Sequence, residues 1–457
     1  GMIGASQSDA LVFFGATGDL AFKKIFPALQ AMVKRGHLDV PVIGVGRSAW
    51  TADQLRARAR ESLEQHGGAD PIACETLCRL LHYVRVDYAD SRTFQALRKE
   101  LGGVEQPLYY LAVPPSLFTT VIEGLAKSGC IDGARVILEK PFGRNLVSAQ
   151  ELNRTLLSYF TEQAIFRIDH YLGKESVQNL MYFRFANPFF ETGWNRHSIQ
   201  RVQITMAEEF GVAGRGRFYE EVGAIRDVVQ SHLLMVMACL VMEQPSGRDY
   251  ESIRDERVKV LKMIRPLIPS DVVRGQFRGY RREGGVAPES QVETFAALRF
   301  YLDSERWAGV PFYVRTGKCL PVTVTEVQVE FKRPRCPVLD EVEPPLPNYF
   351  RFRLSPGVTI AVGTTIKVPG QAMVGKRIEL VAQQCSGDEM GAYERLLGDA
   401  MNGDATLFAR GDGVEAAWRV VQPILDTPMS LHEYEANTWG PSEADRLIEG
   451  DWHNPSG

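Results

Sequence analysis

The sequence predicts two domains: an N-terminal Rossmann-like α/β dinucleotide-binding domain over residues 1–170, and an α+β domain over residues 171–457. A chain of 457 residues is too long to fold around one compact core. Its first part alternates short apolar runs with helical patterns, which is typical of a parallel sheet. After Tyr171, long segments with period-two alternation follow one another with few helices between them. This favours a large, mostly antiparallel sheet with helices on one face.

Composition excludes several classes of protein. Hydrophobic residues make up 45% and charged residues 24% of the chain, as in an ordinary globular protein. A net charge of -4 and a pI near 6.2 give no electrostatic reason to expect nucleic acid as a partner. The longest apolar run, from Val228 to Met242, falls short of the roughly 20 residues that span a bilayer and contains Gln230 and His232. No signal peptide precedes Met2, so we expect a cytoplasmic protein without membrane contact.

The seven cysteines are odd in number and scattered. Cys74 and Cys78 are four residues apart and could meet on a helix face, but no second pair completes a metal site. We therefore expect free thiols and no bound metal.

The first element is an apolar strand, Ala10 to Phe14, followed by a glycine turn and a helix that ends at Gly36. Strand, glycine turn and helix aim backbone N–H groups and a helix N-terminus at a phosphate. The turn carries the spacing G-x-x-G, and an ordinary strand-to-helix turn would also use glycine. Its residues are Gly15, Ala16, Thr17, Gly18, Asp19 and Leu20.

The second apolar strand, Val40 to Val45, ends in Gly46-Arg47-Ser48. In a dinucleotide-binding fold this strand end faces the adenosine ribose, where an acid suits NAD and an arginine suits the 2′-phosphate of NADP. Arg47 therefore favours NADP, with a merely solvated arginine as the alternative.

The alternation continues to about residue 140. Helical patterns cover Ala52–Gln65, Thr93–Leu101 and Leu117–Lys127, and strand patterns cover His82–Val86, Leu108–Val113 and Ala134–Leu138. The segments Ala112–Pro115 and Glu139-Lys140-Pro141 then lie at carboxyl ends of strands, where nicotinamide and substrate should meet. A proline directly after Lys140 suggests a cis bond.

The second half contains eight strand-like segments and four helical ones. The strands are Gln200–Met206, Val272–Tyr280, Phe295–Leu302, Pro311–Arg315, Glu326–Phe331, Phe350–Leu354, Val358–Val362 and Arg377–Ala382. The helices are Val222–Met242, Glu256–Ile264, Ala392–Met401 and Gly413–Ile424.

Three stretches carry chemistry. Arg167 to Glu175 follows an apolar run, and if it continues as a strand, Asp169 and His170 point to opposite faces. His232 lies in an otherwise apolar helix, either as a core residue or as a general base with a pKa near the working pH. Arg315-Thr316-Gly317-Lys318 ends a strand with a glycine turn and a lysine.

Together these segments resemble the glucose-6-phosphate dehydrogenase family from about Leu11 to about Leu425. The resemblance implies oxidation of glucose 6-phosphate at C1 to 6-phosphogluconolactone, with hydride transfer to NADP, in the oxidative branch of the pentose phosphate pathway. It implies that His232 removes the C1 hydroxyl proton and that Asp169 orients His232. It also implies a dimer or tetramer built on the large sheet.

The remaining implied roles concern binding. The substrate residues are Lys140, His170, Tyr171, Lys174, Glu208, Asp227 and Lys318, of which His170, Tyr171 and Lys174 would hold the 6-phosphate. The coenzyme residues are those of the glycine turn with Arg47, Tyr110 and Lys140.

Two positions depart from the family pattern. Phe22 stands where a Lys or Arg is usual after the glycine turn, and Thr323 stands where a second substrate-side cation is common. Each change removes one charged contact, so we expect an altered Michaelis constant rather than lost activity. Oxidation of a different sugar, or use of NAD, is the alternative. A non-catalytic coenzyme sensor would be expected to have lost substrate residues that this chain keeps.

Overall fold

The computed structural model describes residues 7–384 and 390–457 and divides into two compact units. Unit 1 comprises Gly1–Lys174, Pro245–Asp255 and Met390–Val414, and unit 2 comprises Glu175–Gln244, Glu256–Glu389 and Glu415–Gly457. The sequence predicts one domain boundary, after residue 170. In the structure, unit 1 ends after Lys174, and two later segments also belong to it.

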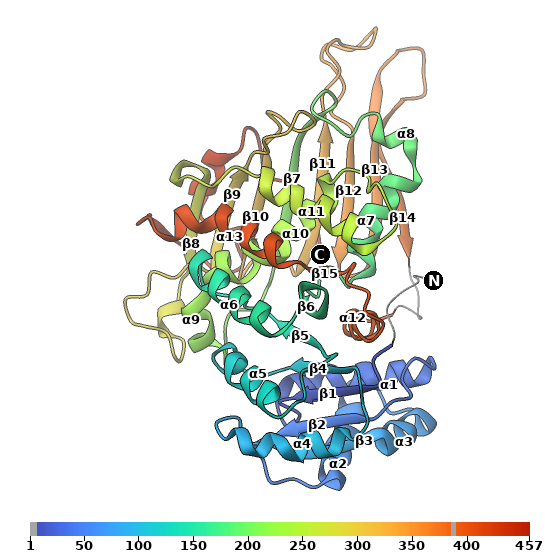
Figure 1. Ribbon diagram of the computed structural model, residues 1–457. Coiled ribbons are helices and arrows are strands. Elements are labelled where there is room, and N and C mark those ends of the chain that lie inside the picture. The colour runs from blue at the N-terminus through green and yellow to red at the C-terminus, as the bar shows by residue number, and fades with distance from the viewer. Residues whose placement is uncertain (1–6, 385–389) are drawn as a thin grey trace. The chain divides into compact units, whose positions relative to one another are not determined.

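Unit 1 is a seven-stranded sheet in the order β15-β6-β5-β4-β1-β2-β3 (Figure 1). All neighbouring strands are parallel except β15, which pairs antiparallel with β6. β1 and β4 are buried along their whole length because they occupy the middle of the sheet. The strands are β1 Ala10–Phe14, β2 Val42–Gly46, β3 Leu81–Arg85, β4 Pro107–Leu111, β5 Arg135–Glu139, β6 Ile165–Ile168 and β15 Phe408–Ala409.

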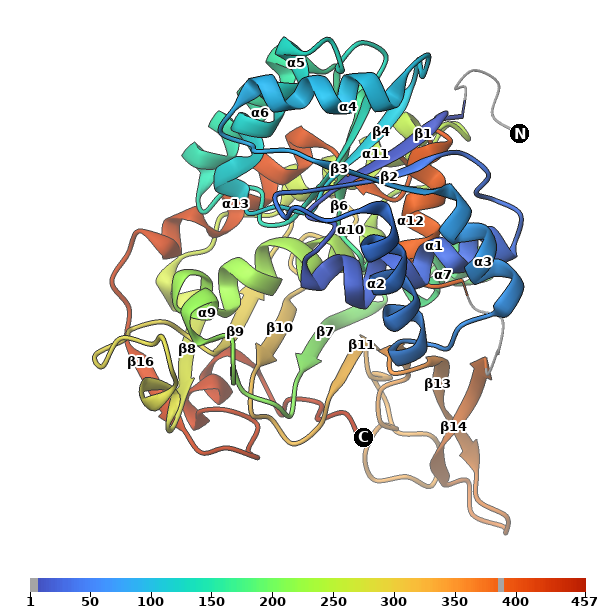
Figure 2. The ribbon, with the colours of Figure 1, turned by 90° about the horizontal axis from the view of Figure 1, so that it is seen from below.

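The helices of unit 1 begin at side-chain caps in several cases. Thr51 and Gln54 form a reciprocal capping box at the start of α2, and Asp70 accepts two backbone N–H groups at the start of α3. α12 contacts α1 although some 360 residues separate them, as the view in Figure 2 shows. The helices are η1 Ala21–Ile25, α1 Phe26–Lys34, α2 Ala52–Gln65, α3 Pro71–Leu80, α4 Phe94–Leu101, α5 Phe118–Lys127, α6 Leu146–Tyr159 and α12 Ala392–Met401.

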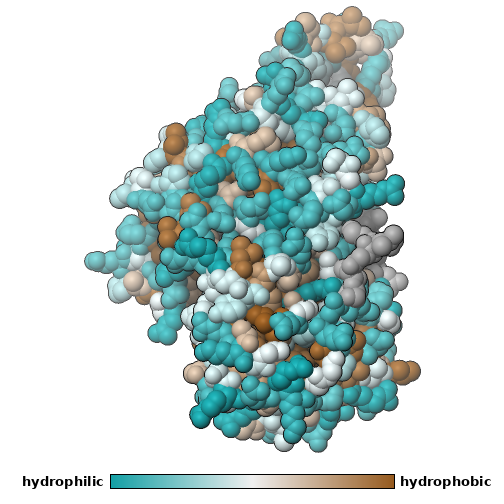
Figure 3. Space-filling view, viewed as in Figure 1, coloured by the Kyte–Doolittle hydropathy of each residue, from teal (hydrophilic) through white to brown (hydrophobic). Residues whose placement is uncertain are grey.

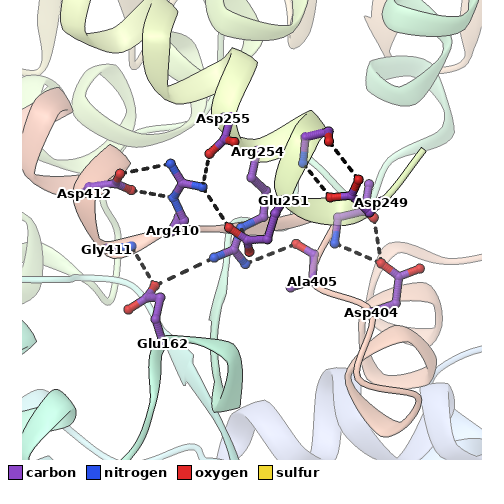
Figure 4. Close-up of polar contacts among 12 residues, drawn as sticks. Glu162, Asp249, Glu251, Arg254, Asp255, Asp404, Ala405, Arg410, Gly411 and Asp412 are labelled. Atoms are coloured by element: carbon purple, nitrogen blue, oxygen red, sulfur yellow. Dashed lines mark hydrogen bonds and ion pairs between the residues drawn. The ribbon is translucent and has the colours of Figure 1, made fainter. Parts of the chain in front are cut away.

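A buried ion-pair network joins the three segments of unit 1 (Figure 4). The Glu162 carboxylate accepts from Arg167 Nη1 at 2.5 Å and from the Gly411 N–H at 2.9 Å, and lies 3.8 Å from Arg254 Nη2. The Arg167 and Arg254 side chains are each about 1% exposed. Arg410 donates to two further carboxylates, at 2.9 and 2.5 Å. Buried charges are tolerated only when they are paired, so these contacts fix the returning segments to the strand that precedes Asp169.

Unit 2 is a nine-stranded sheet in the order β14-β13-β12-β11-β7-β10-β9-β8-β16. The predicted mostly antiparallel sheet is confirmed, with two parallel pairs, β7 with β10 and β8 with β16. The strands are β7 Ile199–Ala207, β8 Val272–Phe277, β9 Phe295–Phe300, β10 Phe312–Gly317, β11 Val324–Phe331, β12 Tyr349–Ser355, β13 Val358–Lys367, β14 Gly375–Gln384 and β16 Leu431–Tyr434.

Helices α7 and α10 of unit 2 pack against each other, and α7 contacts β12 and β13 (Figure 1). The helices of unit 2 are α7 Glu175–Ala186, α8 Pro188–Glu191, α9 Gly216–Ala224, η5 Ile225–Leu233 and α10 Leu234–Val241. Helices α11 Tyr250–Met263 and α13 Gly411–Leu425 begin in unit 1 and continue in unit 2. Short 3-10 helices cover Ser91–Thr93, Pro115–Leu117, Glu162–Ala164, Pro269–Asp271, Tyr280–Arg282 and Ser442–Leu447.

The stretch Gly216–Val241 is one helix that is long and apolar enough to cross a membrane, but 78% of its apolar window is buried inside the protein. Gly223, at φ 75°, kinks it, and a π-helical segment follows the kink. All eight residues of α10 are buried. The stretch is therefore the central core helix of unit 2, where the sequence predicts an unbroken helix from Val222.

Cys74 and Cys78 are free thiols on α3, packed with Leu63. Burial raises the pKa of the Cys78 thiol to about 11, with the neighbouring Cys74 contributing, so the Cys78 thiolate is scarce at neutral pH. Cys385 lies outside the described residues.

Exposed apolar side chains gather on the loop that joins β11 to β12. They are Val338, Leu339, Val342 and Leu346, with exposures of 42% to 93%. Brown side chains at the top of Figure 3 mark this end of unit 2.

Candidate active site

The coenzyme turn, Gly15 to Leu20, follows β1 as predicted and leads into the helical segment η1. Gly15 has φ +80°, and a Cβ on it would lie 2.1 Å from the carbonyl oxygen of Ala112 on the strand end next to it. Only glycine fits this position, since both the backbone conformation and the space exclude a side chain. The Gly18 N–H donates to the Gly15 carbonyl at 3.0 Å, which closes the turn in front of the helix N-terminus. These features fit a diphosphate.

Arg47 follows β2 and is exposed, with its guanidinium carbon 5.9 Å from the centre of the Tyr88 ring. Tyr88 is buried, and burial raises the pKa of its phenol to about 12. The ring is thus a neutral apolar support for Arg47. A side chain so placed can offer its terminal N–H groups to a phosphate outside the strand end.

Tyr110 on β4 has a different environment from the one the sequence suggests. Its side chain is completely buried, and its hydroxyl donates to Glu139 Oε1 at the end of β5. Burial raises the pKa of Glu139, while hydrogen bonds from Tyr110 and Tyr393 oppose the rise. The Lys140–Pro141 peptide is cis, which confirms that prediction. Lys140 is half-buried beside this cluster.

The structure corrects the expectation that Asp169 and His170 continue the strand β6. β6 ends at Ile168, so Asp169 and His170 lie in a turn and strand alternation does not set their directions. The Asp169 side chain accepts the Tyr171 N–H at 2.9 Å, and this bond folds the chain back at once. Asp169 is only 4% exposed, whereas His170 is half-buried.

Tyr171 and Lys174 point the same way, because the Lys174 ammonium lies 4.5 Å from the centre of the Tyr171 ring. The His170 and Tyr171 rings are 5.2 Å apart. Burial lowers the pKa of Lys174, and the positive charge of Lys24 lowers it further. Lys174 is half-buried and Lys24 is exposed, and two lysines that repel each other in this way are suited to a dianionic phosphate.

Lys24 belongs to η1, directly after the coenzyme turn, and is not among the site residues predicted from the sequence. The signal that could have found it is the Lys23-Lys24 pair one turn into the first helix.

Unit 2 brings three of the predicted substrate residues around Tyr219. Lys318 Nζ contacts Glu208 Oε1 at 2.9 Å, and lies 5.5 Å from the centre of the Tyr219 ring. Burial raises the pKa of Tyr219, and Asp227 is the largest of the charges that add to the rise. Glu208 contributes as well. Glu293 adds to the rise as well, so the neutral phenol lies among three acids and one ammonium, a set that can bind sugar hydroxyls.

His232 is 3% exposed and lies five residues after Asp227 on η5. In a π-helical turn the hydrogen bond runs from residue i to i+5, so positions five apart are about one turn apart. The unusual helix therefore brings Asp227 and His232 towards one face, which regular α-helical spacing would not do as closely.

Both departures from the family pattern have a structural role of their own. The Phe22 ring is 9% exposed, beneath the Arg58 guanidinium at 4.1 Å and against His66 at 5.5 Å. The Thr323 hydroxyl accepts the Glu209 N–H at 2.9 Å, next to Glu208. Neither residue replaces the charge of a lysine. Among the residues that the structure describes, no group of three or more His, Cys, Asp or Glu side chains could hold a metal ion.

Two family models cover nearly the whole chain. Residues 12–179 match the NAD binding domain of glucose-6-phosphate dehydrogenase, and residues 181–454 match its C-terminal domain.

The chain belongs to the glucose-6-phosphate dehydrogenase family.

Relatives in this family align over their full length. Glucose-6-phosphate 1-dehydrogenase 1 of Mycobacterium tuberculosis is 42% identical over 99% of this chain and 97% of its own. The enzyme of Aggregatibacter actinomycetemcomitans is 41% identical over 99% of this chain and 98% of its own. The crystal structure of the Mycobacterium avium enzyme has a TM-score of 0.92 at 43% identity, covering 98% of this chain and 99% of that one.

A second glucose-6-phosphate dehydrogenase structure, in complex with its substrate glucose-6-phosphate, has a TM-score of 0.91 at 34% identity. It covers 97% of this chain and 98% of that one. Membership of the glucose-6-phosphate dehydrogenase family thus rests on both domains and not on the dinucleotide-binding unit alone.

Proposed function

We propose that this protein is an NADP-dependent glucose-6-phosphate dehydrogenase, which oxidises D-glucose 6-phosphate at C1 to 6-phospho-D-glucono-1,5-lactone. The observation that carries the proposal is the full-length likeness to a glucose-6-phosphate dehydrogenase in complex with this substrate. The reaction is the first step of the oxidative branch of the pentose phosphate pathway.

The coenzyme fits the residues that would hold it. The side-chain-free turn at Gly15 leaves room for a diphosphate against the backbone, and Arg47 suits the 2′-phosphate that separates NADP from NAD. When bound, NADP accepts the hydride from C1. Tyr110, fully buried, would act through Glu139 rather than by touching the coenzyme, and Lys140 would reach both coenzyme and sugar.

The protein's own residues would hold the sugar and move the proton. His170, Tyr171 and Lys174 bind the 6-phosphate, whose two charges supply binding energy remote from the reacting carbon. The sugar hydroxyls are bound by Glu208, Asp227 and Lys318.

His232 removes the C1 hydroxyl proton as the hydride leaves, so that the lactone carbonyl forms without build-up of charge on oxygen. Asp169 orients the imidazole and stabilises its protonated form.

The test of this assignment is turnover with glucose 6-phosphate and either coenzyme. We expect reduction of NADP by the purified protein, and we expect His232→Asn to lose most of the turnover while the substrate still raises the melting temperature. His197→Asn is the matched control, because His197 is exposed in the same unit. A wild-type rate in His232→Asn would reject His232 as the base, and reduction of NAD alone would reject NADP as the coenzyme.

We also infer a cytoplasmic homodimer or homotetramer. β14 is an edge strand of ten residues, and its Leu380 and Val381 are 58% and 50% exposed. An edge strand of this length leaves a row of backbone N–H and C=O groups unpaired, and β14 also exposes these two apolar side chains, so a second copy of the chain is the fitting partner. Light scattering of the wild type and of a Leu380→Lys variant tests the contact.

A further inference from the structure

The backbone at the end of β2 is held by hydrogen bonds that residues of and after β3 donate to three consecutive carbonyl groups. The Gly46 carbonyl accepts the Val86 N–H at 2.9 Å, the Arg47 carbonyl accepts Arg85 Nε at 3.2 Å, and the Ser48 carbonyl accepts the Tyr83 hydroxyl at 2.5 Å. Tyr83 and Arg85 are two residues apart on β3 and therefore project from the same face. β3 thus fixes the segment that carries Arg47.

Arg85 lies next to Arg47 and keeps part of its guanidinium group available. It pairs in register with Gly46, so it stands beside the residue that precedes Arg47. Only its Nε is used: within residues 7–384 and 390–457, the two terminal nitrogens of Arg85 have no hydrogen-bond or ion-pair partner. With Nε fixed, the fork of terminal N–H groups is preoriented for two oxygens of one anion.

Arg47 and Arg85 carry positive charges with which no described carboxylate pairs. In the described parts of the chain, neither Arg47 nor Arg85 forms an ion pair. The nearest acid in sequence, Asp87, accepts the Ala89 N–H at 3.1 Å and so turns into its own loop. The Arg85 guanidinium lies against the Arg47 backbone, so both positive charges belong to one short stretch of surface, and a dianion bound there is attracted by both.

We propose that Arg85 is a second cation for the 2′-phosphate of NADP, so that Arg47 and Arg85 together select NADP over NAD. The inference rests on the proposed function, because it assigns a residue to the coenzyme of that reaction. The sequence alone predicts only Arg47 for this role.

The decisive variant is Arg85→Gln, since glutamine keeps an N–H donor near the Arg47 carbonyl but loses the charge. We expect the NADP-over-NAD preference in kcat/KM to fall about tenfold, about 1.4 kcal/mol, with the loss in KM for NADP. Arg85→Lys should recover part of it. Arg92→Gln is the matched control, because Arg92 is an exposed arginine in the same region whose charge is already paired with Asp90.

A structural role gives a different result. Tyr83→Phe removes a neighbouring clamp without changing charge, and it should not alter the coenzyme preference. If Arg85→Gln weakens NADP and NAD equally, or changes neither, the second-cation role is overturned and the residue only supports the loop.

Binding of adenosine 2′,5′-bisphosphate and of AMP, measured by calorimetry, separates this inference from the activity itself. We expect Arg85→Gln to weaken the bisphosphate about tenfold and to leave AMP unchanged, with the bisphosphate less sensitive to added salt than in the wild type. If the wild type binds the bisphosphate but does not oxidise glucose 6-phosphate, the proposed reaction fails and the assignment of Arg85 survives. Equal affinity of wild type and Arg85→Gln for the bisphosphate overturns the assignment even if turnover is normal.

Discussion

Asp399 on α12 is a carboxylate whose ionised form is destabilised by its surroundings in the folded protein. Its side chain is 15% exposed, and burial raises its pKa from 3.8 to about 6, with Asp404 adding to the rise. The Arg395 guanidinium, 3.1 Å from Asp399 Oδ2, opposes the rise but does not cancel it. Ionised Asp399 therefore costs folding free energy at neutral pH.

The sign and size of this cost follow from linkage. Between pH 3.8 and about 6 the folded state binds the proton and the unfolded state does not, so the free energy of unfolding falls as pH rises through this window. At about 1.4 kcal/mol for each pH unit, the full cost above pH 6 is about 3 kcal/mol. This cost of about 3 kcal/mol already includes the favourable effect of Arg395, because the raised pKa includes it.

Asp399→Asn should remove the cost, because asparagine resembles the protonated acid. In urea unfolding at about pH 7.5 we expect the variant to be more stable by about 3 kcal/mol, and at about pH 4 we expect the two curves to coincide. Asp39→Asn, at an exposed aspartate of the same unit, should change little at either pH. A variant that is less stable than wild type at neutral pH, or a gain that does not depend on pH, would refute the reasoning.

Two further substitutions test unit 1. Glu162→Gln leaves the buried Arg167 and Arg254 without their shared carboxylate, so we expect the free energy of unfolding in urea to fall by about 3 kcal/mol. Glu123→Gln, at an exposed position, should change it very little. Equal losses in the two variants would contradict the network. Gly15→Ala adds a methyl group 2.1 Å from the Ala112 carbonyl oxygen, whereas Gly36→Ala, at the similar φ of +77°, meets nothing within 4 Å. We expect Gly36→Ala to lower the melting temperature slightly, through about 1 kcal/mol of backbone strain, and Gly15→Ala to lower it far more and to weaken NADP binding; similar losses would show that the clash is relieved.

The sequence by itself determined the elements whose signal is local. The apolar run Ala10–Phe14, the glycine turn after it and the period-two strands of the second half predict their secondary structure because burial pattern and backbone freedom are written into neighbouring residues. The helix Ala392–Met401 is predicted to the residue. The resemblance to the glucose-6-phosphate dehydrogenase family rests on motifs of the same local kind, and the family is confirmed.

Only the tertiary structure decided the properties that depend on residues distant in sequence. Burial and the carboxylate of Glu139 make Tyr110 an internal hydrogen-bond donor, and no pattern around either residue reveals this. The end of β6 at Ile168 depends on a side-chain bond of Asp169 rather than on strand propensity. Arg85 became a candidate because β3 lies beside β2 in the sheet, an adjacency set by packing of the whole unit. Local sequence fixes periodicity and turns, whereas the partners and pKa of a charged side chain follow from which strands and segments fold next to it.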